Sequence, residues 1–213
     1  FFVSYERGHP MRSLATFLVL AAAFGLAVNT ANAAAVTVVN ADFEDPATML
    51  DHIDPVRGDW TMTSVSGWTV TGAAGVFEPI VPGPAYNSLA SGTRVGWSNG
   101  GLMSQLTSGT FGAGNTYTLT VDIGWRFDTA AFPGGDISIF AGDPATIVGS
   151  TALNAAIQGS FIQAVLVLDA LDIAPFVGQQ IGILLSGDRQ QVNFDNVRLM
   201  ETPVPAAIWL FFS

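Results

Sequence analysis

The stretch VNFDNVRL at residues 192–199 reads as a β-strand whose alternation of apolar side chains changes phase partway along. Val192 and Phe194 belong to one phase, whereas Val197 belongs to the other. Because successive side chains of a strand point to opposite faces, this change predicts a β-bulge at Asp195. A carboxylate redirected between apolar neighbours needs a cation, an arginine or several N–H donors. The stretch therefore predicts a strand of a sheet and a functional site on that strand.

Short strands separated by turn residues continue outward from this stretch. The clearest is TYTLTVDIGW at 116–125, in which apolar residues and threonines alternate between the two faces. Further strands are expected at 36–39, 60–63, 68–71, 75–79, 93–97, 102–106, 136–141, 161–169 and 180–186, with one helical turn at 152–157. Many short strands with glycine- and proline-rich turns predict an all-β fold, an antiparallel jelly-roll β-sandwich.

The N-terminal residues predict export. Arg12 supplies a positive charge, residues 14–28 form an unbroken apolar run, and Ala31-Asn-Ala33 is a small-residue cleavage motif. The apolar run is shorter than the roughly 20 residues that a membrane span needs. Residues 1–33 are therefore expected to be an upstream extension plus a signal peptide that signal peptidase removes. The protein is then periplasmic, cell-surface or extracellular in a Gram-negative bacterium.

Composition excludes several functional classes. The sequence has 213 residues and no cysteine, so thiol nucleophiles, disulfides and cysteine-type zinc sites are absent. Beyond residue 33 the chain keeps 16 of its 17 acidic residues and 5 of its 7 basic ones, a formal net charge of −11. This charge argues against nucleic-acid binding, which depends on cations that neutralise phosphates. His52 has no nucleophile motif near it, which argues against a Ser-His-Asp hydrolase.

The C-terminal residues resemble a sorting signal. PVPAAIWLF at 203–211 follows the expected β-sandwich domain, residues 34–201, and resembles the start of a PEP-CTERM signal with Pro-Val-Pro in place of Pro-Glu-Pro. In that family the motif leads into a transmembrane helix and a basic tail that an exosortase processes. The resemblance implies that residues 202–213 are a truncated anchor signal, that an exosortase is a partner, and that contact with a membrane is made only through this anchor.

The β-domain resembles two families that share one frame. NADFE at 40–44, GWTVTGAAGVFEP at 67–79 and NFDNVRL at 193–199 resemble galactose-binding-like modules, the jelly roll of carbohydrate-binding modules. In these modules a structural Ca²⁺ often lies beside the first and last strands, which implies Glu44 and Asp195 as ligands. GWTVTG, GVF and DIGWRFDTAAFPG are also similar to the Stig cyclases of cyanobacterial indole alkaloid pathways. Those calcium-dependent enzymes use an acidic residue and aromatic side chains to cyclise an isoprenylated indole, which implies Asp195 as general acid.

Acidic residues concentrate between residues 40 and 59, which suits a calcium site because Ca²⁺ binds six to eight oxygens. The spacing is not that of an EF-hand. The predicted ligands of a structural Ca²⁺ are Asn40, Asp42, Glu44 and Asp195. The alternative is a solvated acidic loop, with Asp195 paired to Arg198 or Arg126.

Aromatic side chains offer a ligand platform, because flat rings stack on sugar rings or on an indole. The candidates are Trp60, Trp68, Tyr86, Trp97 and Trp125. Trp97 and Tyr86 flank loops and are favoured. Trp125 shares the apolar face of its strand with Tyr117 and is expected to pack in the core.

The main functional prediction is an exported, calcium-stabilised protein that resembles a carbohydrate-binding module and is not an enzyme. Its partner would be a polysaccharide or a small hydrophobic ligand, or none if it is a structural envelope protein. The alternative is a Stig-like, calcium-dependent cyclase of an isoprenylated indole, with Asp195 as its acid.

Overall fold

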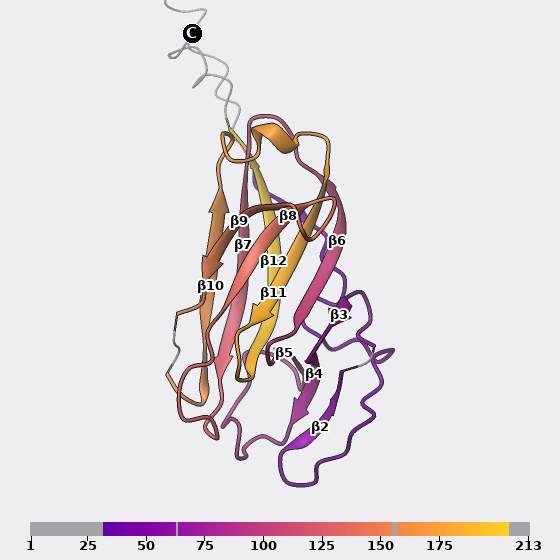
Figure 1. Ribbon diagram of the computed structural model, residues 1–213, viewed down its shortest axis with the longest axis vertical. Coiled ribbons are helices and arrows are strands. Elements are labelled where there is room, and N and C mark those ends of the chain that lie inside the picture. Colours follow the sequence, from indigo (N-terminus) through magenta and orange to yellow (C-terminus); the bar gives the residue numbers. More distant parts are fainter. Residues whose placement is uncertain (1–31, 63, 155–156, 205–213) are drawn as a thin grey trace, which may run out of the picture. The chain divides into compact units, whose positions relative to one another are not determined.

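Alternating apolar residues make the described part of the chain almost wholly β-structure, as predicted. The computed structural model describes residues 32–62, 64–154 and 157–204, whose regular structure is strand apart from one 3₁₀ turn, Ala174–Phe176 (Figure 1). The predicted apolar run of the leader and the predicted sorting motif after residue 204 lie outside these ranges. No helix within the ranges is long and apolar enough to cross a membrane.

The strands form two antiparallel sheets. The first sheet contains β1 Ala34–Val36, β2 Gly58–Thr61, β4 Ala74–Pro79, β5 Val95–Ser98, β7 Asn115–Trp125, β10 Ser160–Leu168 and β12 Val192–Pro203. Its order is β10-β7-β12-β5-β4-β2, and β1 pairs with the C-terminal half of β12. The second sheet contains β3 Thr69–Thr71, β6 Leu102–Thr110, β8 Gly135–Ala141, β9 Ile147–Ala152 and β11 Gln180–Gly187, in the order β3-β6-β11-β8-β9.

The core lies between the two sheets. The apolar face of β7 contributes Tyr117, Leu119, Val121 and Ile123, which are fully buried in one cluster with apolar residues of β11 and β12. Burying one such side chain contributes about 1.5–3 kcal/mol. In Figure 1, β8 and β11 of the second sheet lie in front of β7 and β12 of the first. The predicted antiparallel jelly-roll β-sandwich is confirmed.

The predicted bulge in β12 is also confirmed. Asp195 pairs with Asp122 of β7, whereas Arg198 pairs with Thr120, so β12 places two residues where β7 has one. Asn196 absorbs the extra length with φ of 48°, a left-handed conformation that asparagine tolerates better than most residues. Apolar side chains on both sides of the bulge therefore reach the same core.

One strand was not predicted. Within the described ranges β9, Ile147–Ala152, is an edge strand that pairs with β8 alone, and all of its residues are partly or fully exposed. An edge strand with little buried surface shows weak alternation, which is why the sequence does not reveal it. The helical turn expected at 152–157 is not present in its described part, since Ala152 ends β9 and no regular structure follows at Leu153.

A loop covers the outer face of the first sheet. We call residues 80–94, which join β4 to β5, the covering loop. It packs Tyr86 and Ala85 into a second apolar cluster with Phe77 and Trp97. The outer face therefore has a small core of its own, and the outward side chains of β12 lie beneath it.

Candidate active site

Asp195 lies at the bulge of β12 and is fully buried under the covering loop. Its Oδ2 accepts hydrogen bonds from the backbone N–H and the hydroxyl of Ser91, each at 3.0 Å. Its Oδ1 accepts the backbone N–H of Asn196 at 2.7 Å. Among the described residues, neither Arg126 nor Arg198 pairs with it. Of the three kinds of partner expected for this carboxyl group, the structure therefore shows the third, since N–H donors and one hydroxyl hold it.

Burial raises the pKa of Asp195 to about 6. Desolvation is the main cause, because an apolar environment disfavours the charged form. Hydrogen bonds from Asn196 and Ser91 act in the opposite direction, and the charge of Asp122 adds to the rise. A carboxyl group that is still half protonated at about pH 6 is suited to general acid catalysis.

Asp122 stands directly opposite Asp195 in the neighbouring strand β7. Asn196 bridges the two carboxyl groups, since its backbone N–H binds Asp195 and its Nδ2 donates to Asp122 Oδ2 at 2.8 Å. Asp122 is partly exposed and lines a shallow hollow with Leu89 and Phe161. Like charges at opposite positions of a sheet are unfavourable, so the pair is best accommodated when Asp195 is protonated.

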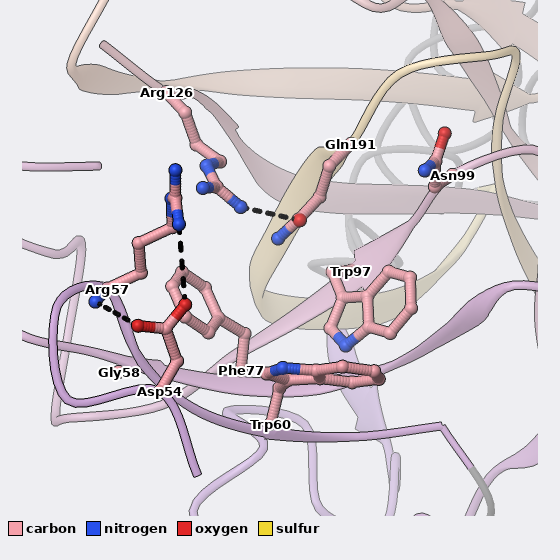
Figure 2. Close-up of a pocket in the computed structure, with 9 residues that line it drawn as sticks. All are labelled: Asp54, Arg57, Gly58, Trp60, Phe77, Trp97, Asn99, Arg126 and Gln191. Atoms are coloured by element: carbon pink, nitrogen blue, oxygen red, sulfur yellow. Dashed lines mark hydrogen bonds and ion pairs between the residues drawn. The ribbon is translucent and has the colours of Figure 1, made fainter. Parts of the chain in front are cut away.

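A pocket of about 180 Å³ lies on the same outer face (Figure 2). Its lining residues are Asp54, Arg57, Gly58, Trp60, Phe77, Trp97, Asn99, Arg126 and Gln191. Gln191, just before β12, shares its face with Asn193 and Asp195 because alternate residues of a strand point the same way. The outward side chains of Gln191, Asn193 and Asp195 therefore form a row along β12, with the pocket at the Gln191 end.

Aromatic rings form one side of this pocket. Trp60 and Trp97 meet edge to face, with ring centroids 5.9 Å apart. His52 stacks on Trp60 at 3.8 Å, and Trp97 Nε1 donates to the carbonyl oxygen of Thr61 at 3.2 Å. These contacts hold both indole rings in fixed orientations, so the platform exists before a ligand arrives.

Two arginines form the opposite side, as Figure 2 shows. Arg126 is buried, binds Asp128 through Nε at 2.7 Å and Nη2 at 2.5 Å, and donates from Nη1 to Gln191 Oε1. Its guanidinium lies 5.1 Å from the Phe77 ring centre. Burial alone would raise the pKa of Asp128, but the hydrogen bonds and charge of Arg126 outweigh it and lower that pKa. Asp128 is therefore ionised, and the ion pair anchors the arginine wall.

Tyr86 separates the pocket from Asp195. Its ring is fully buried and contacts Phe161 at 4.9 Å between ring centroids, and its hydroxyl donates to Asn193 Oδ1 at 2.9 Å. Burial raises the pKa of Tyr86, so the hydroxyl stays protonated. Gln191 and Asp195 are four residues apart, roughly 13 Å along a strand. A molecule that reaches both must therefore displace Tyr86.

Two of the other predicted aromatic ligands lie outside the lining of this pocket. Trp68 is buried in the main core, where its ring packs on Phe43 and its Nε1 donates to the carbonyl oxygen of Asn40. Trp125 packs edge to face with Phe132 at the end of β7 and does not line the pocket. Of the five aromatic candidates, Trp60 and Trp97 line the pocket.

The predicted calcium ligands do not assemble into one site. Glu44 accepts from Thr93 and Arg94, Asp195 from Ser91 and Asn196, and Asn40 Oδ1 from the backbone N–H of Asp45. Asp42 is exposed and accepts the backbone N–H of Glu44 at 3.4 Å. Within residues 32–62, 64–154 and 157–204, no three acidic or histidine side chains form a group that could hold a metal ion. In this structure the predicted oxygens accept hydrogen bonds from the chain's own donors, and calcium binding stays a prediction.

Most of the pocket does not follow from the sequence. Arg57, Phe77, Asn99 and Gln191 are not among the candidate residues, and Arg126 is expected only as a partner of Asp195. One signal was available for Gln191, because it continues the alternate-residue line of Asn193 and Asp195. Nothing in the sequence links that line to Arg57 and Trp60, which come from the far edge of the sheet.

The fold and the buried carboxyl group define a jelly-roll β-sandwich with a candidate acid site on its outer face. The protein-family model for HpiC1-like proteins, described as HpiC1 cyclase, matches residues 34–200. The chain therefore belongs to the HpiC1-like cyclase family. A search among curated proteins finds no match.

Solved structures agree with this family. The chain is similar to the Stig cyclase Fisc from Fischerella sp. TAU in complex with (3Z)-3-(1-methyl-2-pyrrolidinylidene)-3H-indole, with 25% identity, TM-score 0.67, and coverage of 81% of this chain and 100% of that chain. It is similar to an apo cyclase from Fischerella sp., with 26% identity, TM-score 0.66, and coverage of 81% and 98%. A further cyclase from Fischerella sp. TAU gives 25% identity, TM-score 0.64, and coverage of 81% and 99%.

Family membership corrects the main functional prediction. The resemblance to Stig cyclases is confirmed, and a non-enzymatic binding or matrix protein of the carbohydrate-binding type is the wrong reading. The reason is physical: the strand and bulge pattern of NADFE and NFDNVRL specifies a jelly roll, and both classes of protein use that frame. A frame does not reveal which chemistry its surface carries.

Proposed function

We propose that the protein is a cyclase that starts its reaction by protonating an unsaturated, indole-bearing substrate, with Asp195 as the proton donor. The observation that carries the proposal is the fully buried Asp195, whose pKa is raised to about 6, in a chain of the HpiC1-like cyclase family. The complex of the similar Fisc cyclase with an indole compound supports the ring class.

The proposed step is a proton transfer followed by ring closure. Asp195 gives its proton to a substrate carbon, a cation forms, a new carbon–carbon bond closes the ring, and a proton is then lost. The product is an isomer of the substrate, so the proton balance is even. The rings of Tyr86 and Phe161 lie over Gly124 and beside Asn193, two residues before Asp195, and suit this chemistry because aromatic faces attract cations.

The substrate ring is proposed to lie on the Trp60–Trp97 platform, with its side chain directed along β12 toward Asp195. The pocket alone, at about 180 Å³, is smaller than the roughly 300 Å³ at which drug-sized ligand sites begin. It is therefore suited to one fused ring, and a longer substrate needs the space that Tyr86 fills. Movement of the covering loop would provide that space and uncover Asp195 together.

A turnover assay in deuterated water tests the proposal. The full-length protein is incubated with a panel of isoprenylated indoles and the products are analysed by liquid chromatography and mass spectrometry. We expect a product that gains one deuterium and is otherwise isomeric with the substrate, because the donated proton comes from an exchangeable carboxyl group. Asp195→Asn should abolish this product, since a side-chain amide is not a useful acid.

The matched control is Asp136→Asn, which removes a partly exposed carboxylate from β8 in the other sheet. It should turn over as the wild type does. Turnover that persists in Asp195→Asn would remove Asp195 from the mechanism, and no turnover of any indole by the wild type would reject the substrate class.

A further inference from the structure

The pocket beside Trp60 has balanced charges. Two guanidinium groups, Arg57 and Arg126, face two carboxylates, Asp54 and Asp128. Arg126 binds Asp128 with two hydrogen bonds, and Arg57 lies 3.5 Å from Asp54 and 3.4 Å from Asp128. The formal charge of this group is therefore zero. A charged ligand would have to leave water without gaining an unpaired counterion.

Three other polar side chains line the pocket: Gln191 and Trp60 offer N–H donors, and Asn99 has an amide with both a donor and an acceptor. Gln191 Oε1 accepts from Arg126, which fixes the amide so that Nε2 points away from that arginine, as Figure 2 shows. Among the described residues, neither Gln191 Nε2 nor Trp60 Nε1 meets an acceptor. Both nitrogens belong to side chains that line the pocket, so a ligand with an acceptor on its ring edge would satisfy them.

We infer that this pocket selects an uncharged, flat heteroaromatic ligand with a hydrogen-bond acceptor on its edge, such as a carbonyl oxygen, and discriminates against anionic and cationic forms of the same ring. The flat shape follows from the fixed Trp60–Trp97 platform, the neutrality from the balanced arginine and aspartate pairs, and the acceptor from the free donors. The inference rests on the proposed function in one respect, that the pocket holds the substrate ring. It needs no turnover to be tested.

Calorimetric titration with three indoles of one size tests it at pH 7. Indole-3-carboxaldehyde is neutral with an acceptor, indole-3-carboxylate is an anion, and tryptamine is a cation. The wild type should bind the aldehyde roughly tenfold or more tightly than either charged probe, which corresponds to about 1.4 kcal/mol or more. Equal or tighter binding of a charged probe, or no binding of any probe, overturns the inference.

Asp54→Asn is the decisive variant. In the wild type, Asp54 Oδ1 accepts the backbone N–H groups of Val56 and Arg57 at 2.9 and 3.0 Å, and the amide oxygen of the variant can still accept them. The variant removes the carboxylate charge that pairs with the guanidinium of Arg57. The pocket then carries one net positive charge. We expect the affinity for indole-3-carboxylate to rise roughly tenfold relative to the affinity for indole-3-carboxaldehyde. An unchanged preference would show that charge balance does not set selectivity.

The matched control is Asp143→Asn, because Asp143 holds a turn in the same way, by accepting the backbone N–H of Ala145, and does not line the pocket. Its probe preferences should match the wild type. Asp195→Asn separates this inference from the proposed reaction, since it should bind all three probes as the wild type does. Normal probe selectivity without turnover would reject only the reaction, and turnover without this selectivity would reject only the inference.

Discussion

Asp195 has its unusual chemistry because of where its two oxygens lie. Alternation along β12 points the carboxyl group outward from the main core just before the bulge, and the covering loop then buries it. Ser91 and Asn196 satisfy both oxygens, which makes the buried position tolerable without a counterion. The same burial raises the pKa of the carboxyl group above that of an exposed aspartate. Burial therefore affects both the pH dependence of folding stability and the ability of Asp195 to donate a proton.

This origin predicts a pH-dependent difference in stability between the wild type and Asp195→Asn. The folded-state pKa of Asp195 is raised from 3.8 to about 6, so the folded protein holds this proton more tightly than the unfolded chain. Its stabilising contribution is fully present below about pH 4 and is lost as the pH rises through 6. The wild type should therefore lose about 2 kcal/mol relative to the variant between pH 4 and 7.

Urea unfolding of both proteins at several pH values measures this difference. Asp136→Asn serves as the control, and its free energy of unfolding should follow the wild type in its pH dependence. Parallel curves for the wild type and Asp195→Asn would mean that burial does not perturb this carboxyl group.

At the scale of elements, the segment between β1 and β2 is tied to the end of the covering loop by Glu44. Its Oε1 accepts the backbone N–H groups of Thr93 and Arg94, both at 2.7 Å, and its Oε2 accepts the hydroxyl of Thr93 at 3.1 Å. Gly92 lies against the same carboxylate, where an added Cβ would be 2.1 Å from Oε1. Glu44 thus positions the turn that follows Ser91, which binds Asp195.

We expect Glu44→Ala to lower the free energy of unfolding by about 1–3 kcal/mol, because the N–H donors of residues 93 and 94 lose a charged acceptor. The loss should be equal in EDTA and in millimolar Ca²⁺, since the partners of Glu44 are N–H and O–H groups. Thermal and urea unfolding in both buffers measure it, with Glu44→Gln as the milder variant that keeps one acceptor oxygen. A loss seen only with Ca²⁺ present would restore Glu44 as a metal ligand.

At the scale of the whole molecule, the predicted export signal adjoins the first strand. The expected cleavage after Ala33 would leave β1 intact, because that strand begins at Ala34 and pairs with the end of β12 through Ala34 and Glu201. Expressed with its own N-terminus in a Gram-negative host, the protein should begin at Ala34 or Ala35. N-terminal sequencing or intact mass measures this, and a product that retains residues 14–28 would contradict export by a cleaved signal peptide.

Local spacing along the chain was enough to predict the class of fold and the bulge. Alternation depends only on neighbouring residues, so the strand at 116–125 and the phase change at Asp195 are visible without coordinates. The proton-donor role considered for Asp195 rested on the resemblance to Stig cyclases, and that relationship is confirmed by the family match.

Tertiary structure decided which residues meet. The partner of Asp195 is Ser91, 104 positions earlier in the chain, and Arg126 meets Gln191 across 65 positions. Such pairs depend on the order of strands in a sheet and on the path of the covering loop, which alternation does not encode. Trp68 and Trp97 look alike in sequence, yet one is placed in the main core and the other in the pocket. Burial at a given face is set by what packs on it, and that is a property of the assembled sandwich.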